Sequence, residues 1–222
     1  MTKALLFGSI GTLSETSELQ RAAFNETFAQ RGIDWQWSRD AYQAMLKQAG
    51  GRVRIAGFAR HQGVPMDDAL IAGLHAEKSE RFRAMLAQGI APRSGALDLI
   101  AAARSRSWQV GLVSSTARDN VVAVMDGLGG ISLETFDVMV TGQDAPAPKP
   151  DSAAYRTALE RLSCAPGDAL ALEDSATSLA SAVAAGVPCI AVPGANTSDQ
   201  DYSAALTVVR SLSEIDLDAI NL

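Results

Sequence analysis

The chain has 222 residues, of which 47% are hydrophobic and 20% are charged, and its net charge at pH 7 is −6. This balance excludes a disordered chain and argues against a protein that grips a nucleic-acid backbone, which needs a basic surface. No apolar run is long enough for a signal peptide or a membrane span, so we expect a cytoplasmic protein with neither nucleic acid nor membrane as a partner.

Residues 4–7 form a short apolar run, which predicts a buried first strand. The next part of the chain carries helical patterns only, at residues 18–30, 39–47, 53–61 and 67–87. After about residue 90, strand patterns at 109–113, 137–140, 169–172, 189–192 and 206–209 alternate with helical patterns at 95–104, 118–128, 152–162 and 175–185. This order predicts an α/β fold, a doubly wound parallel sheet of the Rossmann-like kind with an inserted α-helical cap. We expect the core at residues 1–14 and 90–222 and the cap at residues 15–89.

Polar residues follow four of the predicted strands, at the ends where an open parallel sheet binds its ligands. The run 8–12 follows the first strand, Ser114 follows the second, Lys149 lies in the loop after the third, and Glu173 with Asp174 follows the fourth. A hydroxyl that donates to a phosphate oxygen, an ammonium group and a pair of hard carboxylates together describe a phosphate site with a divalent cation.

In order and spacing, these four segments resemble the four motifs of the haloacid dehalogenase (HAD) superfamily, and the helical insertion resembles its small α-helical cap. The cap segments 21–29, 34–35, 50–52, 60–62 and 80–82 are similar to those of the CbbY-like, β-phosphoglucomutase-like sugar-phosphate phosphatases. The resemblance covers essentially the whole chain. It implies a Mg²⁺ cofactor at Glu173 and Asp174, a phosphate at Ser114, Lys149 and Thr12, and a substrate contacted by Arg52, Arg54 and Gln20.

The first strand departs from the superfamily, in which it ends in a DxDGT motif, because Gly8 and Ile10 stand in place of the two aspartates. The resemblance assigns the first aspartate to attack on phosphorus and the second to general acid–base catalysis, and neither glycine nor isoleucine can do this. Ser9 is not expected to take over, because alternation along a strand would turn its side chain away from positions 8 and 10. The residues Ser17, Gln20 and Ser178 also stand where the resemblance leads us to expect Glu, His and Gly.

These departures favour a pseudo-phosphatase without the covalent mechanism. It would still bind phosphate or a sugar phosphate, a small phosphorylated metabolite, and it would bind Mg²⁺ weakly or not at all. One alternative is an active Mg²⁺-dependent hydrolase that uses a non-standard route. Another is a protein-interaction or regulatory module with an unknown protein partner.

Several of these residues also have a purely structural interpretation. Lys149 can form an ion pair with the acidic residues, Ser114 can cap the helix at 118–128, and the two cap arginines can be solvated surface charges. The histidines and cysteines are isolated in the sequence and match no metal spacing. We expect packing or surface positions for His61 and His75, and buried thiols in a reducing compartment for Cys164 and Cys189.

Overall fold

A six-stranded parallel sheet forms the centre of the computed structural model, which describes residues 2–8, 10–47, 50–220 and 222. The strand order is β3-β2-β1-β4-β5-β6, and every neighbouring pair is parallel. In chain order, the strands are β1 (Ala4–Phe7), β2 (Gln109–Val113), β3 (Val138–Val140), β4 (Ala169–Glu173), β5 (Cys189–Ala191) and β6 (Thr207–Val208). The predicted doubly wound α/β fold is confirmed.

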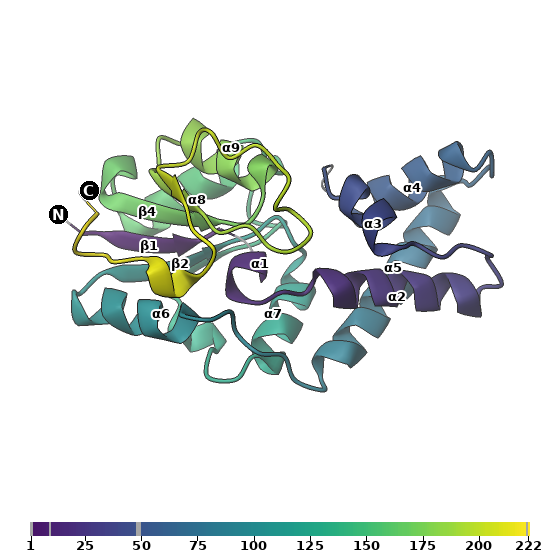
Figure 1. The fold of residues 1–222 in the computed structure, drawn as a ribbon, viewed down its shortest axis with the longest axis horizontal. Coiled ribbons are helices and arrows are strands. Elements are labelled where there is room, and N and C mark those ends of the chain that lie inside the picture. The colour runs from purple at the N-terminus through teal and green to yellow at the C-terminus, as the bar shows by residue number, and fades with distance from the viewer. Residues whose placement is uncertain (1, 9, 48–49, 221) are drawn as a thin grey trace.

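Helices cover both faces of the sheet, because successive side chains of a strand point to opposite faces and both sets are apolar here. On β1, Leu5 and Phe7 belong to one buried cluster, while Ala4 and Leu6 belong to another. The first cluster includes side chains of α6 (Ala96–Ser105) and α7 (Arg118–Gly127), and the second includes side chains of α8 (Ala153–Leu162) and α9 (Ala176–Ala184). These two pairs of helices lie below and above the sheet in Figure 1.

Between β1 and α6, the described residues form helices joined by loops, with no strand of the sheet among them. After the short helix α1 (Ile10–Leu13) come α2 (Ser17–Gln30), α3 (Arg39–Met45), α4 (Gly51–His61) and α5 (Asp68–Leu86). We call residues 17–86 the helical segment; it projects from one end of the sheet (Figure 1). The chain leaves the sheet and returns to it at adjacent points, since the Ser14 hydroxyl donates to the Ala91 carbonyl at 2.8 Å and the Arg93 amide donates to the Leu13 carbonyl at 2.7 Å.

The helical segment has its own aromatic core. Its buried residues are Phe24, Phe28, Trp37, Tyr42, Ile55, Ile71 and Leu74. Helix α5 joins this core to the sheet, because Ile71 and Leu74 lie in the aromatic core while Phe82 and Leu86 lie in the cluster that covers β1.

The predicted elements end within two residues of the observed ones. The sequence analysis missed α1, which is only four residues long, and three short 3-10 helices at Leu133–Thr135, Pro166–Asp168 and Leu212–Glu214. Strand β4 extends one residue beyond the prediction and includes Glu173. Within the described ranges, no helix combines the length and apolar character needed to cross a membrane.

Candidate functional site

A cavity of about 450 Å³ lies between the carboxyl ends of the strands and the helical segment. The sheet side contributes residues that follow β1, β2 and β4, as the topology predicts for an open parallel sheet. The facing side contributes residues of α2, α3, α4 and α5. The lining includes Ile10, Gly11, Ser115, Thr116 and Asp174 from the first side and Gln20, Tyr42, Arg54, His75 and Lys78 from the second.

At the end of β1, the space beside Gly8 is filled by other side chains. The Gly8 amide donates to the Leu172 carbonyl of β4 at 2.9 Å, which fixes its backbone. A Cβ atom added to Gly8 would overlap the Glu173 carboxyl group and the Tyr155 hydroxyl well inside van der Waals contact. No side chain fits at position 8 unless Glu173 and Tyr155 move.

Ile10 is the first residue of α1, and its side chain packs into the cluster that covers β1 with only 6% of its surface exposed. Because a helix begins here, strand alternation does not extend to residue 10, and the reason given for excluding Ser9 as a nucleophile is wrong. Ser9 itself lies outside the described residues.

The Lys149 ammonium group is buried at the centre of the sheet end, with 4% of the residue exposed. It donates to the carbonyl of Gly8, to the carbonyl of Val113 at 2.9 Å and to Glu173 Oε1 at 2.5 Å. An ammonium group has three N–H donors, so all of them are used inside the protein. The ion pair that the sequence analysis gave as the structural alternative is present, and the role of Lys149 in phosphate binding stays a prediction.

Glu173 points into the core rather than into the cavity. It is the last residue of β4, it is fully buried, and its Oε1 also accepts the Tyr155 hydroxyl at 2.6 Å. Burial raises the pKa of Glu173 to about 7, against the opposing effect of Lys149. Its other oxygen, Oε2, is buried without a hydrogen-bond partner among the described residues. Glu173, Lys149 and Tyr155 form what we call the buried triad.

The two predicted metal ligands therefore have different surroundings. Asp174 lies one residue beyond β4, lines the cavity, and approaches Gly11 so closely that a Cβ there would overlap its carboxylate. Glu173 Oε1 is already hydrogen-bonded to Lys149 and Tyr155. In the part of the chain that the structure describes, no three His, Cys, Asp or Glu side chains are grouped so that they could hold a metal ion.

Ser114 and Thr12, the predicted phosphate contacts, are both buried. The Ser114 hydroxyl accepts the Thr116 amide at 3.1 Å, two residues along the same loop. The alternative that Ser114 caps the following helix is wrong, since α7 begins after Ala117 and has no side-chain cap. Thr12 lies within α1 with no exposed surface. Neither residue is assigned to the cavity lining, which instead contains the neighbouring Ser115 and Thr116.

The three predicted cap residues differ in position. Arg54 lines the cavity, and its Cζ lies 5.7 Å from the centre of the Tyr42 ring. Its Nε is buried without a hydrogen-bond partner among the described residues. Gln20 also lines the cavity, and its side-chain oxygen accepts a hydrogen bond from the Lys78 ammonium. Arg52 is exposed outside the lining. The structure thus brings two of the three to the cavity.

The sequence analysis missed Lys78 and expected His75 to be a packing or surface residue, yet both line the cavity. Burial is the main cause that lowers the pKa of His75 to about 4, and Lys78 adds to it. A signal for Lys78 is present in the sequence, because residues 71, 74, 78 and 82 have the spacing of one helix face and the other three are apolar. A lysine at this position of the stripe is expected to be buried, because the apolar face of a helix packs against the core.

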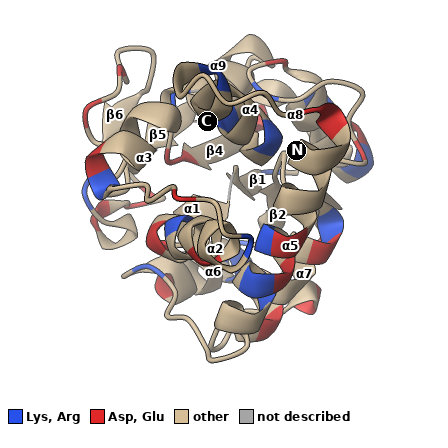
Figure 2. Cartoon of the chain, turned by 90° about the vertical axis from the view of Figure 1, so that its right-hand side faces the viewer, with Lys and Arg blue, Asp and Glu red and all other residues tan. Residues whose placement is uncertain are grey.

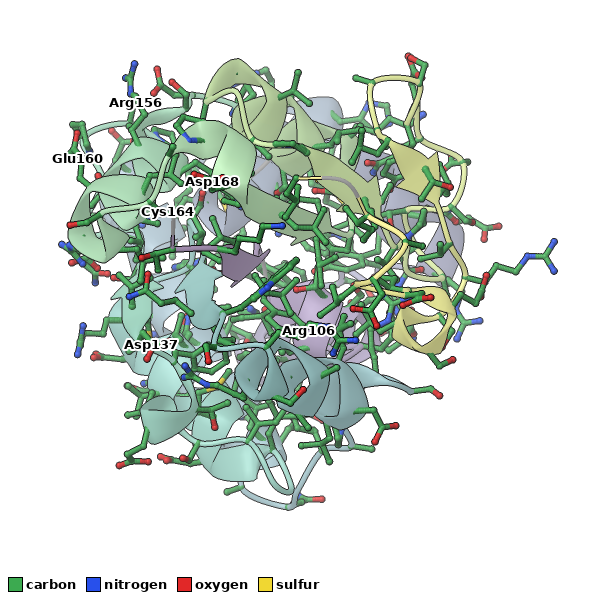
Figure 3. All side chains as sticks on the ribbon, turned by 90° about the vertical axis from the view of Figure 1, so that its left-hand side faces the viewer. Arg106, Asp137, Arg156, Glu160, Cys164 and Asp168 are labelled. Carbon is green, nitrogen blue, oxygen red and sulfur yellow. The ribbon has the colours of Figure 1, made fainter. Side chains whose placement is uncertain are left out.

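The cysteines lie away from the cavity and are buried, as expected. Figure 3 shows Cys164 near Asp168, on the side of the molecule opposite the helical segment. Its thiol donates to the Thr2 carbonyl at 3.2 Å, and burial raises its pKa. Burial also raises the pKa of Cys189. Both thiols are therefore unreactive packing groups.

Comparison with known proteins gives consistent matches. The family model described as "Haloacid dehalogenase-like hydrolase" matches residues 10–192. The chain is 42% identical to the protein CbbY of Cereibacter sphaeroides over 217 residues, which cover 97% of this chain and 94% of that protein. A crystal structure of CbbY from Rhodobacter sphaeroides in complex with phosphate has 41% identity, a TM-score of 0.88 and coverage of 96% of both chains. A mutant of that protein in complex with xylulose-(1,5)bisphosphate has 41% identity, a TM-score of 0.91 and complete coverage of both chains.

Proposed function

The chain belongs to the haloacid dehalogenase-like hydrolase family as a homologue of the CbbY-like phosphatases, and we propose that it is a pseudo-phosphatase, which binds a small phosphorylated metabolite without hydrolysing it. The observation that carries this proposal is the end of β1. Gly8 and Ile10 supply neither a nucleophile nor a general acid, and the Glu173 and Tyr155 side chains of the buried triad occupy the space where a side chain at position 8 would lie. Loss of general acid–base catalysis alone slows a reaction by about 10² to 10⁴-fold.

Phosphate binding in this proposal depends on the side of the cavity formed by the helical segment. Arg54 brings positive charge to the lining, and its buried Nε is left without a hydrogen-bond acceptor among the described residues. A phosphate group offers acceptors with the charge and geometry that such donors need. Lys149 contributes positive charge at the sheet side, although its three donors are engaged with the protein.

The helical segment is the cap in this proposal, with residues 15–89 as the cap and residues 1–14 and 90–222 as the core. Two observations support the division. The helices have a separate aromatic core, and the chain leaves the sheet and returns to it at neighbouring points, which the Ser14–Ala91 hydrogen bond joins. The cavity lies between the two parts. A metabolite there would contact both.

Phosphatases of this family typically use Mg²⁺, which neutralises charge on the reacting phosphoryl group. The donor set of this chain fits a resident ion poorly. Position 8 supplies no carboxylate, and Glu173 Oε1 already accepts two hydrogen bonds, so Asp174 is the remaining acidic donor of the predicted pair. Weak Mg²⁺ binding is therefore part of the proposal.

A paired assay of turnover and binding tests the proposed function. We expect no release of phosphate above background from a generic aryl phosphate or from xylulose-(1,5)bisphosphate, with or without Mg²⁺. We expect the same bisphosphate to raise the melting temperature, because a ligand at 100 times its Kd stabilises the native state by about 2.7 kcal/mol. Arg54→Gln should reduce this shift. Rapid Mg²⁺-dependent hydrolysis by the unmodified chain would overturn the proposal.

Restoring the aspartates gives a second arm of the test. Gly8→Asp with Ile10→Asp should stay inactive, because Tyr155 and Glu173 occupy the space that the new side chain needs. Adding Tyr155→Phe removes one obstructing group and also the hydroxyl that holds the Glu173 carboxyl group, so Glu173 can move aside and Mg²⁺-dependent hydrolysis should then appear. The matched control carries Gly8→Asn and Ile10→Asn with Tyr155→Phe, which has the same packing and no nucleophile. Activity in the double variant equal to that of the triple variant would show that Tyr155 does not obstruct the site.

A further inference from the structure

Lys78 is a buried amine on the wall of the cavity. It lies in α5, a helix that carries charged residues of both signs (Figure 2), and it is only 4% exposed. Its Nζ lies 4.7 Å from the centre of the Phe24 ring and 4.9 Å from the centre of the Phe82 ring, and it donates to the Gln20 side-chain oxygen. The Gln20 hydrogen bond and the two rings thus hold the side chain of this cavity-lining residue in one position.

The groups that face Lys78 do not neutralise its charge. Gln20 on α2 and Tyr42 on α3 are neutral, Arg54 on α4 is positive, and His75 lies one turn away on α5. Asp174 lies across the cavity, and no carboxylate of the described residues is within ion-pair distance of Lys78. Burial, followed by the charge of Arg54, lowers the pKa of Lys78 to about 7. The faces of the Phe24 and Phe82 rings attract the ammonium form, and this attraction raises the pKa of Lys78 against the effect of burial.

We propose that Lys78 forms a reversible imine with the carbonyl carbon of a phosphorylated aldehyde or ketone bound in the cavity. This inference rests on the proposed function, since the cavity is the same one, and it narrows the ligand to metabolites with a free carbonyl group. The desolvated amine supplies the nucleophile. Arg54 supplies positive charge for the phosphate in the same cavity.

The step is balanced without an oxidant or reductant. The lone pair of the neutral Nζ forms a bond to the carbonyl carbon, the carbonyl π electrons move to the oxygen, and a proton passes from the nitrogen to that oxygen. The resulting carbinolamine loses water to give the imine, and addition of water reverses the sequence. Gln20 accepts the N–H of Lys78 and thereby orients the amine before attack.

Reductive trapping tests the inference on the whole protein. The chain is incubated with pyridoxal 5′-phosphate, reduced with sodium borohydride and mapped by mass spectrometry. Its only lysines are Lys3, Lys47, Lys78 and Lys149, so few side chains compete. We expect Lys78 to be labelled about tenfold faster than Lys3 or Lys47, because Lys78 lines the cavity together with Arg54, whose positive charge attracts the phosphate of the reagent. Lys149 is equally buried but ion-paired, and it should stay unlabelled.

Three controls identify the labelled site and separate this inference from the proposed function. Lys78→Arg keeps the charge and should abolish the label at that position, with circular dichroism to verify the fold. Pyridoxal without the phosphate should label Lys78 more slowly, and excess inorganic phosphate should slow labelling by pyridoxal 5′-phosphate. If pyridoxal labels Lys78 as fast as its phosphate ester, the amine is reactive and the phosphate site of the proposed function fails. Labelling of Lys78 no faster than that of Lys3 and Lys47 would overturn the imine proposal and leave phosphate binding intact.

Discussion

Gly8 and Tyr155 are coupled through the space between them, which gives a prediction about stability rather than activity. Gly8→Ala should lower the free energy of unfolding by about 1–3 kcal/mol, because the added methyl group overlaps Glu173 and Tyr155. In a Tyr155→Phe background, Gly8→Ala should lower the free energy of unfolding by less, because the obstructing Tyr155 hydroxyl is absent. Denaturant unfolding of the four chains measures the coupling, which we expect to be about 1 kcal/mol.

Gly73 supplies the matched control for this cycle. It lies within α5, and a Cβ there meets no atom within 4 Å. Gly73→Ala should therefore raise stability by about 0.5–1 kcal/mol, as expected for an open helix position. If Gly8→Ala lowers the free energy of unfolding equally with and without the Tyr155→Phe change, the Tyr155 hydroxyl does not obstruct a side chain at position 8.

His75 makes the stability of the protein depend on pH. Its folded pKa of about 4 lies below its ordinary value of 6.5. Between these values the unfolded chain binds a proton that the folded protein does not, so stability is complete above pH 6.5 and is lost as the pH falls toward 4. Because His75 is half-buried and partly screened by solvent, we expect a loss of about 1 kcal/mol between pH 7 and pH 5. His75→Gln should remove this part of the loss in denaturant titrations, whereas His61→Gln at an exposed position should not.

Single residues of the site were predictable where a motif fixes their place in the chain. The order of the strands placed position 8, Lys149 and Asp174 at one end of the sheet, because parallel strands share their carboxyl edge. The direction of the Glu173 side chain was not predictable, since it depends on whether β4 ends at residue 172 or 173. Tyr155 was missed because only tertiary packing of α8 on the sheet brings its hydroxyl to Glu173.

At the scale of elements, the apolar runs located the strands, since β1 to β5 are mostly buried within the sheet while the edge strand β6 is exposed. Helix α1 was missed because four residues are too few for an apolar periodicity to appear. The connection from α2 to α3 has no such pattern either, and side-chain hydrogen bonds hold it. Asn25 on α2 donates to the Trp37 carbonyl at 3.0 Å and accepts the Trp37 amide at 2.8 Å.

Replacing Asn25 should therefore loosen this connection. Asn25→Leu leaves the buried Trp37 amide without an acceptor, and we expect a loss of about 2–3 kcal/mol in the free energy of unfolding. The Trp37 carbonyl keeps a second donor in Arg21, at 2.9 Å, which limits the loss. Glu26→Leu, at the exposed neighbouring position of the same helix, is the control and should change stability by less than about 0.5 kcal/mol. Equal effects of the two substitutions in denaturant titrations would show that Asn25 does not fix the connection.

At the scale of the molecule, the sheet and the helical segment have separate cores, and two helices, α2 and α5, contribute side chains to both. Phe24, Phe28 and Trp37 pack on one another with ring centres 4.6 to 6.1 Å apart, away from the clusters on the two faces of the sheet. Helix α5 enters both, with Leu74 in the aromatic core and Phe82 beside the sheet. This arrangement leads us to expect that the helical segment opens independently of the sheet.

Phe28→Ala tests this expectation by hydrogen exchange. Removing a fully buried phenyl ring costs about 3–5 kcal/mol, and the loss falls on the aromatic core to which Phe28 belongs. Amides of α2, α3 and α4 should exchange faster, while those of β1 and β4 keep their protection. Within α5 the change should fade between Leu74 and Phe82, because the second half of the helix is held by the sheet. Leu170→Ala, in the centre of β4, removes a side chain from the sheet core and should instead raise exchange in β1 and β4. If Phe28→Ala raised exchange equally in β1 and β4, the two cores would form one cooperative unit, and the helical segment would not open independently of the sheet.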